Sequence, residues 1–162
     1  MIAIGIHNAQ SHVPLDEKRL GDAVRMVLEE ASVARAQISL AVVDDPTIRR
    51  LHRAYLAADE PTDVLSFLLE RSGDCLEGEV IVSGQTAKLA AARFGWSAED
   101  ELLLYVIHGT LHLVGYRDAT PQQQAEIRRR EGACLSRFGI EARYEESDVP
   151  PEGAIEEEEK VP

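Results

Sequence analysis

Two histidines and an aspartate in the second half of the chain could together hold a metal ion. His108 and His112 are four residues apart, so on a helix their side chains lie on one face about a turn apart. Gly115 lets the chain leave such a helix sharply, and Asp118 can then return toward the two imidazoles. Two imidazoles and a carboxylate are zinc ligands, and three protein ligands leave a fourth position for water. His108, His112 and Asp118 therefore predict one zinc ion in a catalytic site.

The residues around this pair strengthen the metal interpretation. The two histidines stand in a strongly apolar helical segment, where burying an unpaired polar group costs roughly 1–3 kcal/mol. Zinc-protease signatures are related, but there a glutamate directly follows the first histidine and activates water. Gly109 occupies that position here, so a metallopeptidase of that mechanism would lack its general base.

An alternation of strand and helix signals must position these residues. Short segments rich in isoleucine, valine and leucine predict strands, and apolar residues at helical spacing behind capping residues predict helices. Mixed connection lengths favour a mixed sheet, so we expect an α+β fold, an α/β sandwich, in which four strands pack with about five helices. The predicted strands are 2–7, 38–43, 64–69 and 79–82, and the predicted helices begin near Pro14, Asp45, residue 84, residue 98 and Pro121.

Composition limits the class of protein. A chain of 162 residues with 44% apolar residues fits one domain with one core. Two cysteines far apart in the sequence exclude a disulfide scaffold and favour a reducing compartment. The longest strongly apolar run, 102–107, is far shorter than the roughly 20 residues of a membrane span. The first residues do not resemble a signal peptide, so we expect a cytoplasmic protein without a membrane partner.

The negative charge is concentrated at the C-terminus. Residues 145–162 hold eight acids and one base, which gives this segment −7 of the net charge of −12. The segment is also rich in proline and has little to bury, so we expect a disordered acidic tail after a single domain at 1–144. The domain is mildly acidic, which counts against bulk electrostatic binding of nucleic acid but allows a local basic patch.

Two arginine clusters could supply such a patch. Arg49, Arg50 and Arg53 fall on one short predicted helix, with Arg49 and Arg53 on the same face. They are candidate RNA-binding residues through contacts to phosphates, although a solvated helix face is an equal alternative. The run 128–130 spreads around the last predicted helix and is a weaker candidate.

The segment 108–116, His-Gly-x-Leu-His-Leu-x-Gly-Tyr, resembles the signature of the YbeY family of bacterial metallo-endoribonucleases. Residues 61–67, Pro-Thr-Asp-Val-Leu-Ser-Phe, match the family's second hallmark, and the resemblance covers about residues 38–139. It implies a zinc-dependent, single-strand-specific endoribonuclease that acts in 3′-end maturation of 16S ribosomal RNA and in ribosome quality control. It also implies a cytoplasmic α/β sandwich with the zinc-bearing helix beside a cleft, and small-subunit ribosomal proteins as further partners. Other matching positions are Leu51, Tyr55, Gly78 and Glu79.

Four positions depart from the family pattern. Asp118 stands where the family usually has a third histidine, and it keeps a possible metal ligand. His52 replaces the usual asparagine, while Leu56 and Ala58 replace an arginine and a lysine. Leucine and alanine cannot stabilise phosphate charge, so we expect a weak ribonuclease in isolation. The alternatives are a non-catalytic, ribosome-associated zinc protein and a metallopeptidase, which Gly109 disfavours.

The sequence leaves the nucleophile open. No obvious protein base stands beside the predicted zinc ligands. Either a metal-activated water or the 2′-hydroxyl of the RNA would then attack the phosphate.

Overall fold

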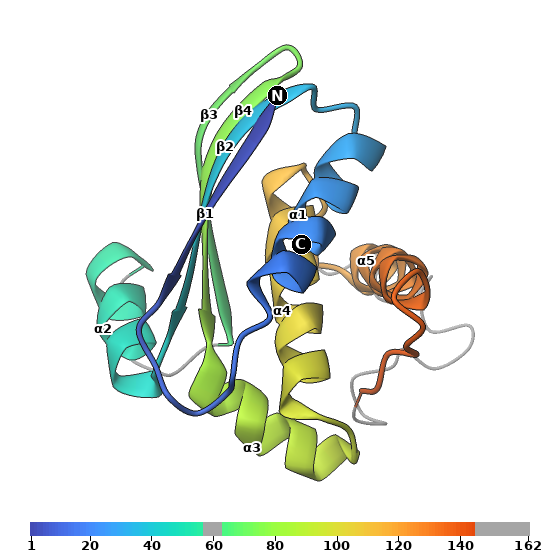
Figure 1. Ribbon diagram of the computed structural model, residues 1–162. Coiled ribbons are helices and arrows are strands. Elements are labelled where there is room, and N and C mark those ends of the chain that lie inside the picture. Colours follow the sequence, from blue (N-terminus) through green and yellow to red (C-terminus); the bar gives the residue numbers. More distant parts are fainter. Residues whose placement is uncertain (57–62, 145–162) are drawn as a thin grey trace.

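The computed structural model describes residues 1–56 and 63–144, with side chains over 1–55 and 63–144. The predicted tail at 145–162 lies outside these residues, so a domain at 1–144 followed by a disordered tail stays a prediction. The described part contains one four-stranded sheet and five helices (Figure 1). The strands are β1 (Ile2–Asn8), β2 (Arg35–Val43), β3 (Val64–Ser72) and β4 (Cys75–Ser83), and the helices are α1 (Glu17–Glu30), α2 (Asp45–Leu56), α3 (Gly84–Phe94), α4 (Ala98–Leu113) and α5 (Pro121–Ser136).

The sheet is mixed, as the connection lengths predicted. Its strand order is β1-β2-β4-β3, in which β1, β2 and β4 run parallel and β3 runs antiparallel to β4. The strands β3 and β4 are longer than predicted, because the polar residues near their shared turn still pair through the backbone. Ser72 pairs with Cys75, and Gly73 takes a positive φ of 59° in the two-residue turn between them.

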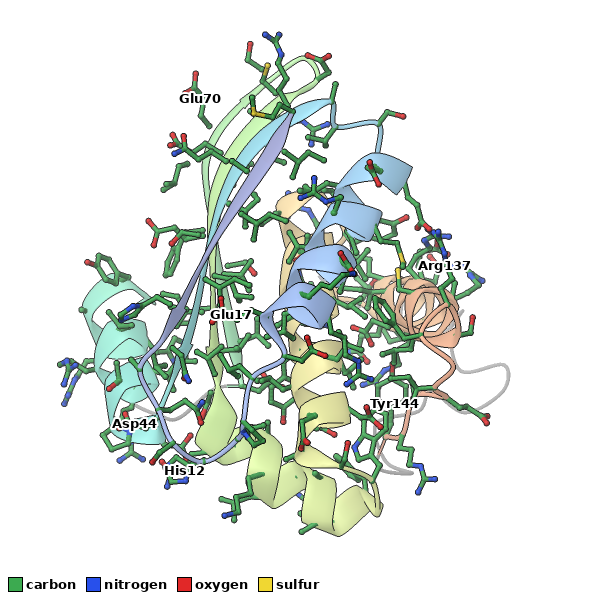
Figure 2. The ribbon with its side chains drawn as sticks, in the orientation of Figure 1. His12, Glu17, Asp44, Glu70, Arg137 and Tyr144 are labelled. Atoms are coloured by element: carbon green, nitrogen blue, oxygen red, sulfur yellow. The ribbon has the colours of Figure 1, made fainter. Side chains whose placement is uncertain are left out.

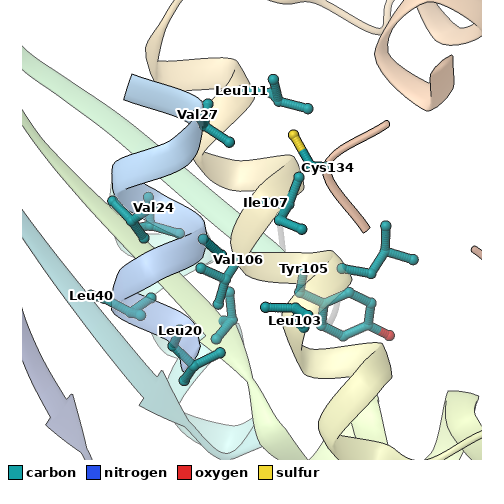
Figure 3. Packing of buried hydrophobic residues seen from close by; sticks show 14 of the residues in the cluster. Leu20, Val24, Val27, Leu40, Leu103, Tyr105, Val106, Ile107, Leu111 and Cys134 are labelled. Atoms are coloured by element: carbon teal, nitrogen blue, oxygen red, sulfur yellow. The ribbon is translucent and has the colours of Figure 1, made fainter. Parts of the chain in front are cut away.

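Helices cover the two faces of the sheet unequally (Figure 1). On one face α1 and α4 pack against alternate residues of β2 such as Ile38 and Leu40, which are almost fully buried. Figure 3 shows Val24 of α1 beside Val106 of α4 in this main core. On the other face α2 buries only a small second cluster around Ile48. The helix α4 is therefore the central helix of the described residues, and eleven of its sixteen residues are buried.

Most predicted helix ends agree with the structure. Ser97 and Thr120 cap α4 and α5, and Gly95 ends α3 in the left-handed region. The predicted start of α1 at Pro14 is wrong, because Asp16 is the cap and accepts a hydrogen bond from the backbone N–H of Arg19 at 3.1 Å.

The predicted cap of α2 is wrong by one residue. Asp44, not Asp45, accepts the capping hydrogen bond from the Thr47 backbone N–H at 2.9 Å. The Asp45 carboxylate instead accepts hydrogen bonds from the hydroxyls of Ser83 and Thr86, at 2.5 and 2.6 Å. These bonds connect α2 to the start of α3. Among the residues that the structure describes, no helix is both long and apolar enough to span a bilayer.

Candidate metal centre

A glycine allows α4 to lie directly against the sheet. A Cβ atom on Gly109 would come within 2.6 Å of Val80 Cγ1 and 2.8 Å of Val64 Cγ1. The Ser66 hydroxyl donates a hydrogen bond to the Gly109 carbonyl at 2.8 Å, which holds β3 to α4 at this point. The residue after His108 thus packs against the sheet and has no room for the glutamate of a zinc-protease signature.

A Schellman turn ends α4 and reverses the chain. The backbone N–H of Tyr116 donates to the Leu111 carbonyl at 3.0 Å, and that of Gly115 donates to the His112 carbonyl at 3.1 Å. Gly115 has a φ of 109°, a conformation that residues with a Cβ rarely adopt. The reversed chain carries Asp118 back to the helix face that bears the two histidines.

His108, His112 and Asp118 converge as the spacing predicted. The Nε2 atoms of the two histidines are 3.0 Å apart, and Asp118 Oδ2 lies 3.5 Å from His108 Nε2 and 3.4 Å from His112 Nε2. One ligand atom from each of the three residues lies within 4.8 Å of the other two. One ion could contact all three atoms.

The hydrogen bonds of the two imidazoles fix which nitrogens face this point. His108 Nδ1 lies 2.5 Å from a carboxylate oxygen of Glu131, and His112 Nδ1 lies 2.9 Å from the backbone carbonyl of Tyr116. Both partners can only accept, so both Nδ1 atoms carry a hydrogen. In the neutral rings, two Nε2 lone pairs and a carboxylate oxygen of Asp118 then face one another. Three acceptors so close together repel unless a cation lies among them, and the residues therefore fit a metal ion.

The pKa values show the same preference for positive charge. Burial opposes protonation of His108, but hydrogen bonds with Asp118 and Glu131 outweigh it and raise the pKa of this imidazole to about 10. Hydrogen bonds from His108 and His112 hold the pKa of Asp118 well below its usual range. The surrounding carboxylates therefore stabilise a positive charge on His108.

The sequence analysis did not identify Glu131, which orients the first histidine. Its side chain comes from α5 and is only 3% exposed. One carboxylate oxygen faces His108, and the other accepts a hydrogen bond from the Tyr144 hydroxyl at 2.6 Å. A signal was present, because Glu131 stands four residues after Ile127 in the buried stripe of α5. A buried glutamate at such a position needs a partner, and a metal-ligating histidine is a suitable one.

A cavity of about 340 Å³ opens beside the candidate metal centre. Its position agrees with the cleft that the family resemblance implies. His108, Asp118 and Glu131 line one part of it, and Asp63 from the family's second hallmark lines another. Tyr144, on the segment that follows α5, also lines the cavity and lies on the same side of the sheet as α4 (Figure 2). Further lining residues are Arg93, Phe94, Glu101, Tyr105, Arg128 and Arg143.

The structure does not bring the predicted arginine cluster to this cavity. Arg49, Arg50 and Arg53 are exposed on α2, which packs on the opposite face of the sheet from α4 (Figure 1). Phosphate contact by these three residues stays a prediction. The side chain of Leu56 and the whole of Ala58 lie outside the described residues.

Comparisons with known proteins agree with the geometry. The family model described as Endoribonuclease YbeY matches residues 5–139. A protein of that name from Moorella thermoacetica is 38% identical over 151 residues, which cover 83% of this chain and 96% of that protein. Another from Desulfitobacterium hafniense is 39% identical over 134 residues, which cover 76% of this chain and 83% of that protein. The solution structure of a Thermotoga maritima protein, 24% identical, shares the fold with a TM-score of 0.57 over 86% of this chain and 92% of that chain. The chain therefore belongs to the endoribonuclease YbeY family.

Proposed function

We propose that the protein is a zinc-dependent endoribonuclease that cleaves single-stranded RNA. Its substrate is 16S ribosomal RNA, which it processes at the 3′ end during maturation and quality control of the small subunit. The observation that carries the proposal is the convergence of His108, His112 and Asp118 beside a cavity, in a chain of the endoribonuclease YbeY family. Small-subunit proteins and a cytoplasmic location belong to the same proposal.

The donor set supports zinc as the resident metal. Two imidazole nitrogens and one carboxylate oxygen are the ligand types of catalytic zinc sites, which leave a fourth position open. When bound there, a zinc ion supplies Lewis-acid activation of water and of a phosphate oxygen at neutral pH. Glu131 and the carbonyl of Tyr116 hold the two imidazoles with their Nε2 atoms toward Asp118, where these three residues would hold the ion.

The carboxylates of the cavity have different environments. Asp118 and Glu131 face the histidines, and burial raises the pKa of Glu101, which accepts a hydrogen bond from Trp96 Nε1 at 2.7 Å. Asp63 is exposed at the cavity. Two nucleophiles, water and the RNA 2′-hydroxyl, are compatible with this arrangement. Attack by the 2′-hydroxyl leaves a 2′,3′-cyclic phosphate, so analysis of the product ends distinguishes the two.

Incubation with three substrates tests the proposal. The full-length protein, loaded with zinc, is mixed with single-stranded RNA, duplex RNA and an unstructured peptide, each with and without a chelator. We expect cleavage of the single-stranded RNA alone, its loss with the chelator and its return with added zinc. A zinc-loaded protein that leaves RNA and peptide intact would instead be a non-catalytic zinc protein. Chelator-sensitive cleavage of the peptide would indicate a metallopeptidase.

A further inference from the structure

Three consecutive arginines on α5 have three different environments. Arg129 forms an ion pair with Glu126 on the same helix. Arg130 forms an ion pair with Glu30 of α1 on the outside of the molecule. Arg128 lines the cavity of the metal centre. The fold thus separates one cavity-facing arginine from two neighbours of the same chemistry.

Arg128 is connected to the candidate metal centre through Tyr144 and Glu131. Its guanidinium carbon lies 4.2 Å from the centre of the Tyr144 ring, in a cation–π contact. The hydroxyl of that tyrosine donates to Glu131, which in turn accepts from His108. A guanidinium stacked on a ring keeps N–H groups along its edge, where they can donate to an anion. The position of Arg128 is therefore linked to the position of the metal ligands.

A second arginine lines the same cavity. The Nη1 atom of Arg143 donates hydrogen bonds to the backbone carbonyls of Gly95 at 2.8 Å and Phe94 at 3.4 Å. These bonds hold its guanidinium at the end of α3, and they use only part of its five donors. Within residues 1–56 and 63–144, neither Arg128 nor Arg143 forms an ion pair with a carboxylate.

Among the described residues, no carboxylate forms an ion pair with either of these two arginines. Of the carboxylates that line the cavity, Asp118 faces the two histidines, and Glu131 faces His108 and the Tyr144 hydroxyl. An RNA strand brings a negative phosphate with each nucleotide, and guanidinium groups recognise phosphate through paired N–H donors. If one phosphodiester of a single-stranded RNA lay at the metal centre, the neighbouring phosphates would lie along the side of the cavity that Arg128 and Arg143 line.

We propose that Arg128 and Arg143 bind the backbone phosphates next to the phosphodiester at the metal centre. The proposal rests on the function proposed above, because it takes RNA as the ligand. In this arrangement the RNA strand would lie along the side of the cavity formed by α5 and residues 137–144, and we call this side the phosphate track. Arg129, one residue away on the same helix, is outside this track.

Binding of an RNA analogue at several salt concentrations tests the proposal. The probe is a short, fluorescently labelled 2′-O-methyl oligoribonucleotide, checked on a gel for integrity, and the protein is full-length and zinc-loaded. We expect Arg128→Gln and Arg143→Gln each to weaken binding about tenfold, the worth of a hydrogen bond to a charged group. Each variant should also lower the slope of log K against log salt by about 0.7, the value for one phosphate contact on a single strand.

Two matched variants separate phosphate binding from a structural role. Arg129→Gln removes the same charge from the same helix outside the cavity, and it should leave the affinity unchanged. Arg128→Lys keeps the charge but loses the planar donors, so it should restore the salt slope while affinity stays below that of the wild type. Equal effects of Arg128→Gln and Arg129→Gln on affinity and slope would overturn the proposal.

Failure of this proposal differs from failure of the proposed function. A wild type that cleaves RNA with zinc, while Arg128→Gln and Arg143→Gln bind the probe like wild type, would refute the phosphate track alone. A wild type whose probe binding needs both arginines but which never cleaves RNA would refute the enzymatic function and support the track. Zinc content measured on every variant ensures that the compared proteins carry the same metal.

Discussion

At the scale of single residues, Asp118 differs from the two histidines of the candidate metal centre in how the fold holds its side chain. The Asp118 side chain is 47% exposed, whereas those of His108 and His112 are 26% and 27% exposed. The histidines belong to a buried helix, but Asp118 reaches the centre only through the turn at Gly115. Replacing Asp118 should therefore affect metal binding far more than folding.

Asp118→Ala should lose most of its zinc, because two histidines and waters hold the ion poorly. Asp118→His should keep about one zinc per chain, since imidazole is also a zinc ligand. The measurement is the zinc-to-protein ratio by elemental analysis after dialysis, with the melting temperature of the metal-free proteins as the control. Full zinc occupancy in Asp118→Ala would show that a different group completes the site.

Glu101 allows a prediction about pH, because it is a buried carboxyl group. Burial raises its pKa above the usual range, although hydrogen bonds from Trp96 and Tyr105 act in the opposite direction. The folded state thus favours the protonated form more than the unfolded state does. The stability gained from this preference is present below the unfolded pKa and is lost as the pH rises through the folded pKa.

Glu101→Gln should remove this loss, because glutamine stays neutral and can still accept the hydrogen bond from Trp96. The free energy of unfolding of the variant, relative to wild type, should therefore increase as the pH rises from 4 toward 8. Urea unfolding of metal-free proteins at several pH values measures the difference. A difference that is constant or falls over this range would mean that the Glu101 pKa is not raised.

Spacing alone predicted that His108, His112 and Asp118 come together, since all three lie within one helix and the turn that follows it. Spacing also puts Glu131 on the buried face of α5, but it could not show that this carboxylate meets His108, because the contact depends on the packing of α5 against α4. The same packing distinguishes Arg128 from Arg129, which are adjacent in the sequence and chemically identical. Sequence periodicity places residues on a helix face but does not say which element that face will meet.

At the scale of elements, the close contact between α4 and the sheet determines where the metal centre lies. Gly109 contacts Val80 of β4 and Val64 of β3. Gly78 of β4 makes a similar contact, because a Cβ there would lie 2.9 Å from Leu113 Cδ2. Gly109 belongs to the segment that resembles the family signature, and Gly78 is a further position that matches the family pattern. Both glycines allow close packing in this structure.

Gly109→Ala should destabilise the protein by about 1–3 kcal/mol, because the added methyl group overlaps two side chains of the sheet. Gly132→Ala in α5 is the matched control. That position has no atom within 4 Å of an added Cβ, so alanine should stabilise the helix there by about 0.5–1 kcal/mol. Chemical unfolding measures both. Equal effects of the two substitutions would show that α4 does not lie this close to the sheet.

Local signals predicted the elements better than their exact ends. Thr120 and Gln123 form the complete capping box that begins α5, as the sequence indicated. The capping residue of α2 was displaced because the Asp45 carboxylate bonds to Ser83 and Thr86, which are distant in the sequence. Tertiary contacts of this kind decide between two neighbouring capping residues, and sequence patterns do not contain them.

At the scale of the whole molecule, the sheet separates two groups of arginines. The arginines of α2 lie on one face, and the arginines that line the cavity lie on the face that α4 covers. The chain crosses from α2 on one face to β3, and then through β4 and α3 to α4 on the other. The order of elements is readable from the sequence, but the face that each helix covers is not. For this reason the sequence could suggest Arg49, Arg50 and Arg53 as RNA-binding residues but could not show that they lie across the sheet from α4.

Deletion of residues 145–162 should leave the melting temperature nearly unchanged. The segment is acidic and rich in proline, and it offers little apolar surface to bury. Calorimetry of the full chain and the shortened chain makes the comparison under identical metal loading. A decrease of more than about 5 °C would show that the segment packs against the domain.

One metal ion at His108, His112 and Asp118 should support RNA cleavage, and a titration of the activity with zinc tests this expectation. Protein freed of metal with a chelator and then desalted receives zinc in small steps, and the initial rate of single-stranded RNA cleavage is measured at each step. We expect a rate that starts near zero, rises linearly and levels off at one zinc per chain, with no rise in Asp118→Ala over the same range. A rate that is already maximal before zinc is added, or that is unaffected by Asp118→Ala, would contradict this expectation.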